Sequence, residues 1–420
     1  MRNAGHIIHF LRELAQIREL RGRICVNGSP TGYDFDRVID RRGTSSLKWD
    51  FGEKFTGMSG LIPLWVADMD FEVPAEILQA LRARVEHGIF GYTLEPDSYF
   101  DAAAGWLQRR HGWEVRREWM LPSPGVIPSL VLAILGLTEP GDGIVIQPPV
   151  YYPFPLRITA NGRRVVENPL KLSGVQWEMD LDGLAKVLDE RTRMLILCSP
   201  HNPVCRVWDR ATLGALAEFC LRRGIVIVSD EIHNDLVMPG SRHIPFASLS
   251  HEVAARTVTL VSATKSFNLA GLGGSLTLIP DAGLRARFDA VQHAVMGGPA
   301  NALTASAAEA AWRHGERWLE ELLAYVQGNY RFLAGFLAEN LARVTLAPLE
   351  GTYLAWMDMR ALMLSDDQIR AKLQRDAGLW LDEGRKFGRG GEGFQRLNLA
   401  CPRAILSDAA ERLVRAFHLS

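Results

Sequence analysis

Short, almost continuously apolar runs alternate with amphipathic stretches through the middle of the chain. The apolar runs predict strands over residues 143–146, 193–198, 224–228 and 257–261, and the stretches between them predict helices over residues 97–110 and 213–223. A further helix, which is apolar, is predicted over residues 129–137. Strands that are apolar on both faces are typical of a mainly parallel sheet covered by helices on both sides. The pattern therefore predicts a large α/β/α domain.

The two ends of the chain carry different patterns. Apolar residues at helical spacing predict an amphipathic helix over residues 6–20, which we interpret as an extension without chemistry. A long helix over residues 317–341, with strands over 344–346, 352–356 and 394–399, predicts a smaller α+β domain. The predicted division is an N-terminal extension (1–32), an N-terminal part of the small domain (33–75), a large domain (76–316) and a small C-terminal domain (317–420).

Composition excludes several classes of function. The chain has 420 residues, 47% of them hydrophobic, and a formal net charge of -1, so neither a nucleic-acid partner nor a membrane surface is expected. The 5 cysteines include no Cys-x-x-Cys pair, which favours reduced thiols in a cytoplasmic protein over metal ligation. The chain has no apolar run long enough to span a bilayer, and its first residues lack the order of a secretory signal.

Polar residues gather directly after the predicted strands. Lys265 follows the strand over 257–261, Asp230 and Asn202 follow two others, and Tyr151 comes shortly after residues 143–146. Ligands of open α/β sheets bind at such carboxyl ends, so we expect these side chains to converge. Partial burial would lower the pKa of Lys265 and let its amine form an imine with an aldehyde, although a surface lysine on a polar loop is the simpler interpretation of this residue alone.

Two further features suggest anion binding. A Pro/Gly turn leads into an apolar helix at Gly125, Val126 and Ile127, whose free N–H groups suit a phosphate, although many helices begin in this way. Arg396 lies within an apolar strand and needs an anionic partner there. That partner is either an internal carboxylate or the carboxylate of a substrate.

Two acids and one tyrosine have competing interpretations. Asp68 and Asp70 end an apolar run, where they could act as acid and base, but acids in this place more often cap the next helix, here expected to start at Pro74. Tyr92 follows a glycine in a short loop and could be an ordinary loop residue.

Together these parts match the needs of pyridoxal 5'-phosphate, which has an aldehyde, a pyridine nitrogen, a ring hydroxyl and a phosphate. Lys265 would bind the aldehyde, Asp230 would keep the pyridine nitrogen protonated, and Asn202 would donate to the ring hydroxyl oxygen. Tyr151 would stack on the ring. Ser262 would join the turn at residues 125–127 in holding the phosphate, and Arg396 would bind the carboxylate of an amino acid.

From about Tyr33 to its C-terminus, the chain resembles the fold-type I pyridoxal phosphate enzymes of the aspartate aminotransferase superfamily. It is most similar to the MalY/PatB-type cystathionine β-lyases, a family of C–S lyases. The resemblance rests on Trp-Val-Ala-Asp-Met-Asp-Phe (65–71), Gly-Tyr-Thr (91–93), Pro-Val-Tyr (149–151), His-Asn-Pro (201–203), Ser-Asp-Glu-Ile-His (229–233), Ser-Ala-Thr-Lys-Ser-Phe-Asn (262–268) and Arg-Leu-Asn (396–398). It implies an aspartate aminotransferase-like fold with a large mainly parallel α/β/α domain and a smaller α+β domain.

The resemblance also implies a reaction and further site residues. Lys265 would remove the Cα proton of cystathionine or another cysteine S-conjugate, and β-elimination would give a thiol, pyruvate and ammonia. His233 would contact the cofactor, Ala67 would contact the substrate, and Tyr92 would act catalytically across the interface of a homodimer with shared active sites. No metal is implied.

Some residues depart from the related patterns. Aminotransferases usually have tyrosine in place of His233 and a phosphate-binding arginine in place of Gly273, whereas Cys205 replaces a glycine that is usual in the lyases as well. We expect Gly273 and Gly274 to make the segment after Lys265 open.

The alternatives are an aminotransferase with the same site, a biosynthetic enzyme that processes a larger cysteine conjugate, and decarboxylation or oxidative deamination. A regulatory protein that binds a transcription factor would be a non-enzymatic alternative, against which the intact Lys265 and Asp230 argue.

Overall fold

The computed structural model describes residues 32–296 and 301–418, and from Phe35 onward they belong to one compact unit. Its centre is a seven-stranded sheet in the order β2-β10-β9-β8-β7-β3-β4. Strand β10 is antiparallel to both of its neighbours, and the other pairs are parallel. The strands are β2 (Met120–Ser123), β3 (Gly143–Ile146), β4 (Arg164–Glu167), β7 (Thr192–Cys198), β8 (Val226–Asp230), β9 (Thr257–Val261) and β10 (Ser275–Leu278).

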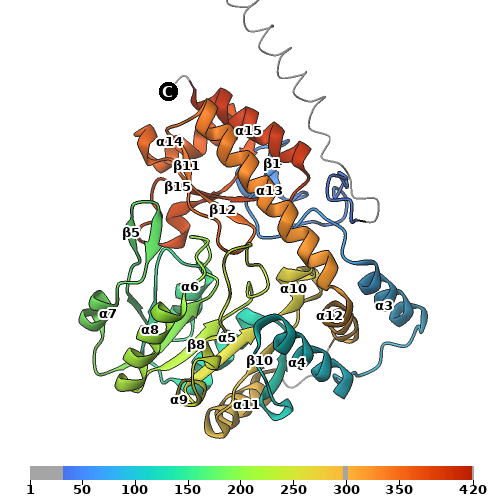
Figure 1. The fold of residues 1–420 in the computed structure, drawn as a ribbon, viewed down its shortest axis with the longest axis vertical. Coiled ribbons are helices and arrows are strands. Elements are labelled where there is room, and N and C mark those ends of the chain that lie inside the picture. Colours follow the sequence, from blue (N-terminus) through green and yellow to red (C-terminus); the bar gives the residue numbers. More distant parts are fainter. Residues whose placement is uncertain (1–31, 297–300, 419–420) are drawn as a thin grey trace, which may run out of the picture. The chain divides into compact units, whose positions relative to one another are not determined.

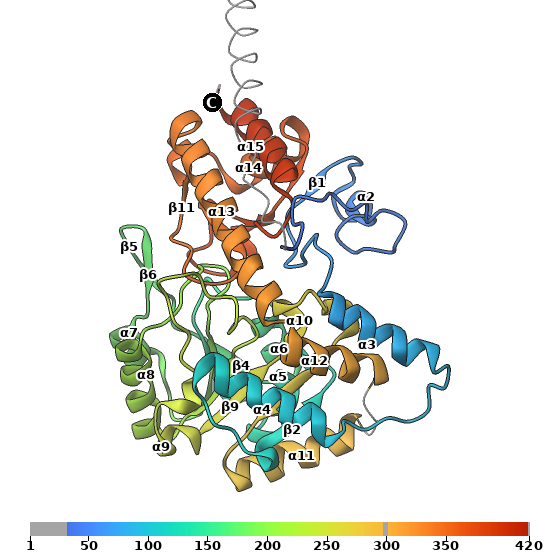
Figure 2. The ribbon, with the colours of Figure 1, turned by 45° about the vertical axis from the view of Figure 1, so that its right-hand side comes forward.

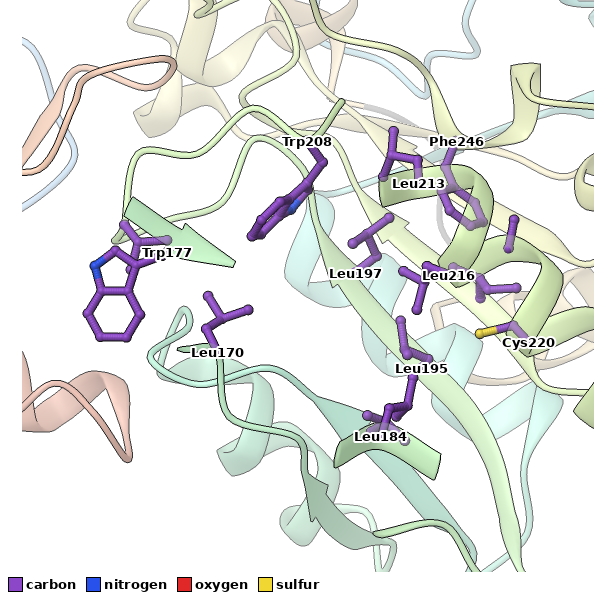
Figure 3. Close-up of a cluster of buried hydrophobic side chains, with 14 of the residues drawn as sticks. Leu170, Trp177, Leu184, Leu195, Leu197, Trp208, Leu213, Leu216, Cys220 and Phe246 are labelled. Carbon is purple, nitrogen blue, oxygen red and sulfur yellow. The ribbon is translucent and has the colours of Figure 1, made fainter. Parts of the chain in front are cut away.

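The sheet separates two apolar cores, because successive side chains of a strand point to opposite faces. In β7, Leu195 and Leu197 join one core, and Met194 and Ile196 join the other. The first core is shown in Figure 3 and receives side chains from α7 (Leu181–Val187) and α8 (Arg210–Arg223), and the second receives them from α5 (Val126–Leu137), α6 (Pro153–Ala160) and α11 (Ala282–Met296). Each large apolar side chain that is fully buried contributes about 1.5–3 kcal/mol.

A second, four-stranded sheet has the order β11-β12-β15-β14 and belongs to the C-terminal part of the chain, coloured orange to red in Figure 1. The long helix α13 (Glu316–Asn340) leads into this part and packs on α15 (Arg403–Phe417), as Figures 1 and 2 both show. The strands of this second sheet are β11 (Thr345–Leu346), β12 (Leu354–Asp358), β14 (Asp382–Glu383) and β15 (Phe394–Asn398). Helix α14 (Asp366–Ala371) lies between β12 and β14 along the chain.

Two short strands tie the N-terminal segment to the C-terminal part. Strand β1 (Ile62–Pro63) pairs in parallel with β13 (Leu379–Trp380). The remaining elements include a hairpin and several helices, among which α12 packs on α3 and α4. They are α2 (Gly52–Thr56), α3 (Ala75–Glu86), α4 (Asp97–His111), β5 (Lys171–Ser173), β6 (Gln176–Glu178), α9 (His251–Ala254), α10 (Ala263–Ser266) and α12 (Ala302–His314).

The large parallel sheet with helices on both faces is confirmed. Strands β3 and β9 have the bounds that the apolar runs predict, whereas β2 and β10 were not predicted. The helix predicted over residues 6–20 lies outside the described residues, and the four domain limits stay a prediction. Among the described helices, none is both long and apolar enough to cross a bilayer.

Candidate active site

The carboxyl ends of the parallel strands bring the predicted residues together. Asp230 ends β8, Lys265 lies in the short helix directly after β9, and Asn202 follows β7. Arg396, on β15 of the second sheet, donates from Nη1 to Asn202 Oδ1 over 2.9 Å. The site therefore lies where the two sheets of the unit meet. Tyr151 lies there too, since the charges of Asp230 and Arg396 both act on its hydroxyl, whose pKa burial raises to about 12.

Lys265 has the properties expected of a reactive amine. Its side chain is half-buried, and Nζ donates to the carbonyl oxygen of Ala67 over 2.6 Å. Desolvation lowers the pKa of Lys265 to about 8, helped by the charge of Arg396 and opposed by the charges of Asp68 and Asp230. A substantial fraction of this amine is therefore neutral near pH 8.

Asp230 is a buried carboxylate without a cation at contact distance among the described residues. It is 3% exposed and accepts a hydrogen bond from the backbone N–H of Ile232 over 3.1 Å. Desolvation raises the pKa of Asp230 to about 7, and the nearby charge of Glu231 adds to the rise. A buried carboxylate of this kind favours a ligand that brings a positive charge or an N–H donor.

Arg396 has the internal partner that the sequence left open. Its Nη2 donates to Asp382 Oδ2 over 2.8 Å and to the carbonyl oxygen of Trp65 over 2.9 Å. The guanidinium lies 4.7 Å from the centre of the Phe387 ring, while its buried Nε has no partner among the described residues. Part of its hydrogen-bonding capacity is therefore unused.

The turn predicted to hold a phosphate has a suitable backbone. Gly125 precedes the first turn of α5, where Val126 and Ile127 carry the free N–H groups of a helix start. Ser262 Oγ lies at the end of β9 and donates to the carbonyl oxygen of Gly274 over 2.7 Å. Gly274 N in turn donates to the carbonyl oxygen of Pro124 over 2.7 Å, so the Ser262 segment and the α5 turn are held side by side.

The expectation that Gly273 and Gly274 leave this segment open is wrong. Gly273 has φ +71°, and a Cβ on it would lie 2.8 Å from the carbonyl oxygen of Pro124. Gly274 has φ +93°, and a Cβ there would collide with the side chain of Thr304. Both glycines are therefore required by backbone conformation and by close packing.

His233 is buried near Lys265 and Arg396. Desolvation lowers its pKa to about 3, and the two neighbouring cations lower it further, so the imidazole is neutral at physiological pH. Its Nδ1 is buried without a hydrogen-bond partner among the described residues. Such an atom is costly to leave unpaired and is expected to find a partner in a bound ligand.

Tyr92 is not brought to the site within one chain. Its side chain is 98% exposed, and no hydrogen bond from it is found in the described part of the chain. It lines a cavity of about 1180 Å³ together with Pro124 and Gly274.

Asp68 and Asp70 are structural rather than helix caps, which corrects the capping interpretation. Helix α3 begins after Pro74 without a side-chain cap. Asp70 Oδ2 accepts from the fully buried Lys48 over 2.6 Å, and Arg41 Nη1 binds both acids at 2.9 Å. These contacts hold the segment that carries Ala67. They could not be predicted, because Lys48 is an isolated lysine in a polar stretch of the sequence.

A second buried network holds the turn that carries Lys265. Asp235 is 3% exposed and accepts from Ser266 Oγ over 2.7 Å, from Trp106 Nε1 over 3.0 Å and from His111 Nε2 over 2.9 Å. Burial alone would raise the pKa of Asp235, but its hydrogen bonds with His111 and Ser266 lower it. Since Ser266 is the next residue after Lys265, the network fixes α10 against α4.

The described residues contain no group of side chains that could hold a metal ion. The side chains at the site instead offer an amine, a carboxylate, an amide, a neutral imidazole and a guanidinium. This set suits a small anionic ligand that carries an electrophile and a basic ring nitrogen.

Comparison with known proteins agrees with this geometry. The chain is 43% identical over 385 residues to cystathionine beta-lyase PatB of Bacillus subtilis, an alignment that covers 91% of this chain and 99% of PatB. It is 32% identical to the protein MalY of Escherichia coli, over 91% of this chain and 98% of MalY.

Among solved structures, cystalysin from Treponema denticola, which contains a pyridoxal 5'-phosphate cofactor, superposes with a TM-score of 0.89 at 34% identity, over 92% of this chain and 99% of cystalysin. The predicted fold-type I architecture is thereby confirmed. The model of the family "Aminotransferase class I and II" matches residues 59–413. The chain belongs to the aminotransferase class I and II family.

Proposed function

We propose that this chain is a pyridoxal phosphate-dependent C–S β-lyase that cleaves cystathionine or another cysteine S-conjugate to a thiol, pyruvate and ammonia. The observation that carries the proposal is that two side chains of opposite kind lie at neighbouring strand ends. Lys265 is an amine with a lowered pKa, and Asp230 is a buried carboxylate without a cation at contact distance in the described part of the chain. The similarity to PatB and cystalysin supports the same reaction class.

The residues present fit the cofactor. Asp230 would pair with the protonated ring nitrogen, which supplies the positive charge that this carboxylate lacks. The N–H groups of Val126 and Ile127, with Ser262, would hold the phosphate. Asn202 uses Oδ1 to bind Arg396 and keeps its Nδ2 amino group for the ring hydroxyl oxygen. Tyr151 would cover one face of the ring.

His233 completes this set, because a ligand oxygen or nitrogen beside its ring would satisfy a buried imidazole that is otherwise poorly paired. When bound, pyridoxal phosphate supplies an aldehyde that binds the amino group of the substrate and a ring that stabilises negative charge at Cα.

Lys265 acts as the base that removes the Cα proton of the substrate. At pH 8 the Lys265 amine is neutral in about half of the molecules, whereas an ordinary lysine is neutral in fewer than about one in a hundred. The carbonyl oxygen of Ala67, 2.6 Å from Nζ, holds the amine in place and leaves its lone pair for the proton. Arg396 binds the carboxylate of the substrate and so fixes the orientation of the Cα–H bond.

We also propose that two copies of the chain form a homodimer with shared active sites. Ile89, Phe90, Tyr92 and Leu94 are exposed apolar or aromatic side chains within one short segment. Such a group is typical of a surface that another chain covers. In the dimer, Tyr92 would reach the site of the partner subunit.

A mixing experiment tests the shared site. The variants Tyr92→Ala and Lys265→Ala are each inactive under the proposal, and mixing them should restore part of the activity, because one site of each hybrid dimer is intact. The absence of recovery, with subunit exchange confirmed by differently tagged chains, would contradict the sharing of sites.

A cytoplasmic location belongs to the same proposal. The four cysteines within the described residues are buried free thiols, which suits a reducing compartment. Cell fractionation would place the activity in the soluble cytoplasmic fraction, and recovery outside it would contradict the location.

A panel of cysteine S-conjugates tests the reaction. The holoenzyme should release pyruvate and free thiol in equal amounts from cystathionine or from an S-alkylcysteine, with no change in the amount of the aldehyde form of the cofactor. Release of a 2-oxo acid that still contains the sulfur, with the cofactor left as its amine, would show an aminotransferase instead.

A further inference from the structure

Arg396 uses three of its five N–H donors on the protein itself. Nη1 donates to Asn202 Oδ1, and Nη2 donates to both the Trp65 carbonyl oxygen and Asp382 Oδ2, at 2.8–2.9 Å. A guanidinium binds a carboxylate through two parallel N–H groups, either Nε with Nη2 or Nη1 with Nη2. Since both pairs include Nη2, a substrate carboxylate bound in this way must displace one of the two present acceptors.

The Trp65 carbonyl oxygen is poorly placed to move. It belongs to a segment that is hydrogen-bonded on both sides, where Leu64 N donates to the carbonyl oxygen of Trp380 and Asn398 Nδ2 donates to that of Val66. Moving this carbonyl would strain both of these hydrogen bonds.

Asp382, in contrast, is a side-chain acceptor with a second partner. It lies directly opposite Arg396 in the pairing of β14 with β15. Its Oδ1 accepts from Lys386 Nζ over 3.0 Å, while its Oδ2 binds Arg396. The Lys386 side chain is 44% exposed, so it can follow the carboxylate when Asp382 turns away from Arg396.

We propose that Asp382 occupies the place of the substrate carboxylate on Arg396 and moves to Lys386 when the substrate binds. It is a positioning residue, which keeps the buried guanidinium paired between turnovers and sets the affinity for the α-carboxylate. This inference rests on the proposed function, in which Arg396 binds that carboxylate. It predicts that Asp382 and Lys386 influence affinity in opposite directions.

The test measures the binding of L-alanine to the holoenzyme through the absorbance of the cofactor, because alanine has the carboxylate but no leaving group. The variant Asp382→Asn keeps the shape and an acceptor but removes the competing charge, so the Kd for alanine should fall by about tenfold. The variant Lys386→Gln removes the alternative partner of Asp382, so the Kd should rise several-fold.

Two controls separate charge effects from this exchange. Ethylamine carries the amine without the carboxylate, and both variants should bind it as the unmodified enzyme does. Lys171→Gln breaks a lysine–aspartate pair in which the lysine is exposed, with Asp180 at 2.9 Å, and should leave the Kd for alanine unchanged.

Each other outcome decides against the inference. If Asp382→Asn weakens alanine binding, Asp382 only orients Arg396, and if neither variant changes the Kd, no exchange of partners takes place. The variant Arg396→Gln separates the role of Arg396 in binding the carboxylate from the exchange of partners by Asp382. Weaker alanine binding in this variant supports the carboxylate-binding role, even if the Asp382 and Lys386 variants show no exchange. Unchanged binding in Arg396→Gln would overturn both.

Discussion

Removal of the Asp235 carboxylate should loosen the turn that carries Lys265. Asp235→Ala would leave three buried donors without an acceptor, on Trp106, His111 and Ser266. Each unsatisfied buried group costs about 1–3 kcal/mol, and loss of one partner from a buried pair costs about 3–5 kcal/mol, so we expect a loss of about 3–5 kcal/mol in unfolding free energy. Against a typical domain stability of about 5–15 kcal/mol this loss is large.

The matched variant Asp235→Asn separates shape from charge. Its Oδ1 can still accept from Trp106 and His111, which both bind one oxygen, and its Nδ2 can donate to Ser266 Oγ, because a hydroxyl also accepts. We expect a loss of about 1–2 kcal/mol, since hydrogen bonds to a neutral amide are weaker than those to a carboxylate.

Urea unfolding of the apoprotein, followed by tryptophan fluorescence, measures both losses. The kcat of the holoenzyme should fall in the same order, with cofactor content retained in Asp235→Asn, because the reacting amine is less well placed. A stability of Asp235→Ala within about 0.5 kcal/mol of the unmodified protein, the size expected for an unimportant surface change, would refute the reasoning.

Three further predictions concern other parts of the site. Lys48→Met should cost about 3–5 kcal/mol in urea unfolding, because it leaves the buried Asp70 without its 2.6 Å partner, and a cost below about 1 kcal/mol would contradict this. Gly273→Ala should lower the melting temperature and the cofactor affinity through strain of about 1–3 kcal/mol at φ +71°, and unchanged values would show that the turn can relax. Burial lowers the pKa of His201 to about 4, so the folded protein holds this imidazole neutral. Its contribution to the unfolding free energy is complete above about pH 6.5 and is lost as the pH falls towards about 4. At pH 5 the loss is about 2 kcal/mol. His201→Gln should therefore show a smaller loss of unfolding free energy between pH 7 and pH 5, and an equal loss would contradict this.

The sequence predicted the strands that are apolar throughout. It did not predict two strands that contain or follow proline and glycine, which are typical of turns. Strand β2 contains Pro122 and was interpreted as part of a turn, yet proline is tolerated on an edge strand, which β2 is. Strand β10 follows Gly273 and Gly274, which suggested an open segment, whereas the structure packs both glycines against other chain segments.

The residues at strand ends could be predicted because parallel strands place their carboxyl ends at one edge. Their supporting contacts could not, because the partners lie far apart in sequence: Asp235 meets His111 across 124 positions, and Arg396 meets Asn202 across 194. Whether an acid caps a helix or holds a lysine also depends on the fold, which is why Asp70 was misinterpreted.

Chemical trapping of the cofactor on the chain tests the central claim most directly. Borohydride reduction of the holoenzyme, followed by peptide mapping, should place the reduced cofactor on Lys265, and Lys265→Ala should give neither the label nor turnover. Burial lowers the pKa of Lys265 to about 8, helped by the charge of Arg396. The hydrogen bond from its Nζ to the carbonyl oxygen of Ala67 would hold this amine in place for the reaction. A label on any other lysine, or turnover in Lys265→Ala, would contradict the account.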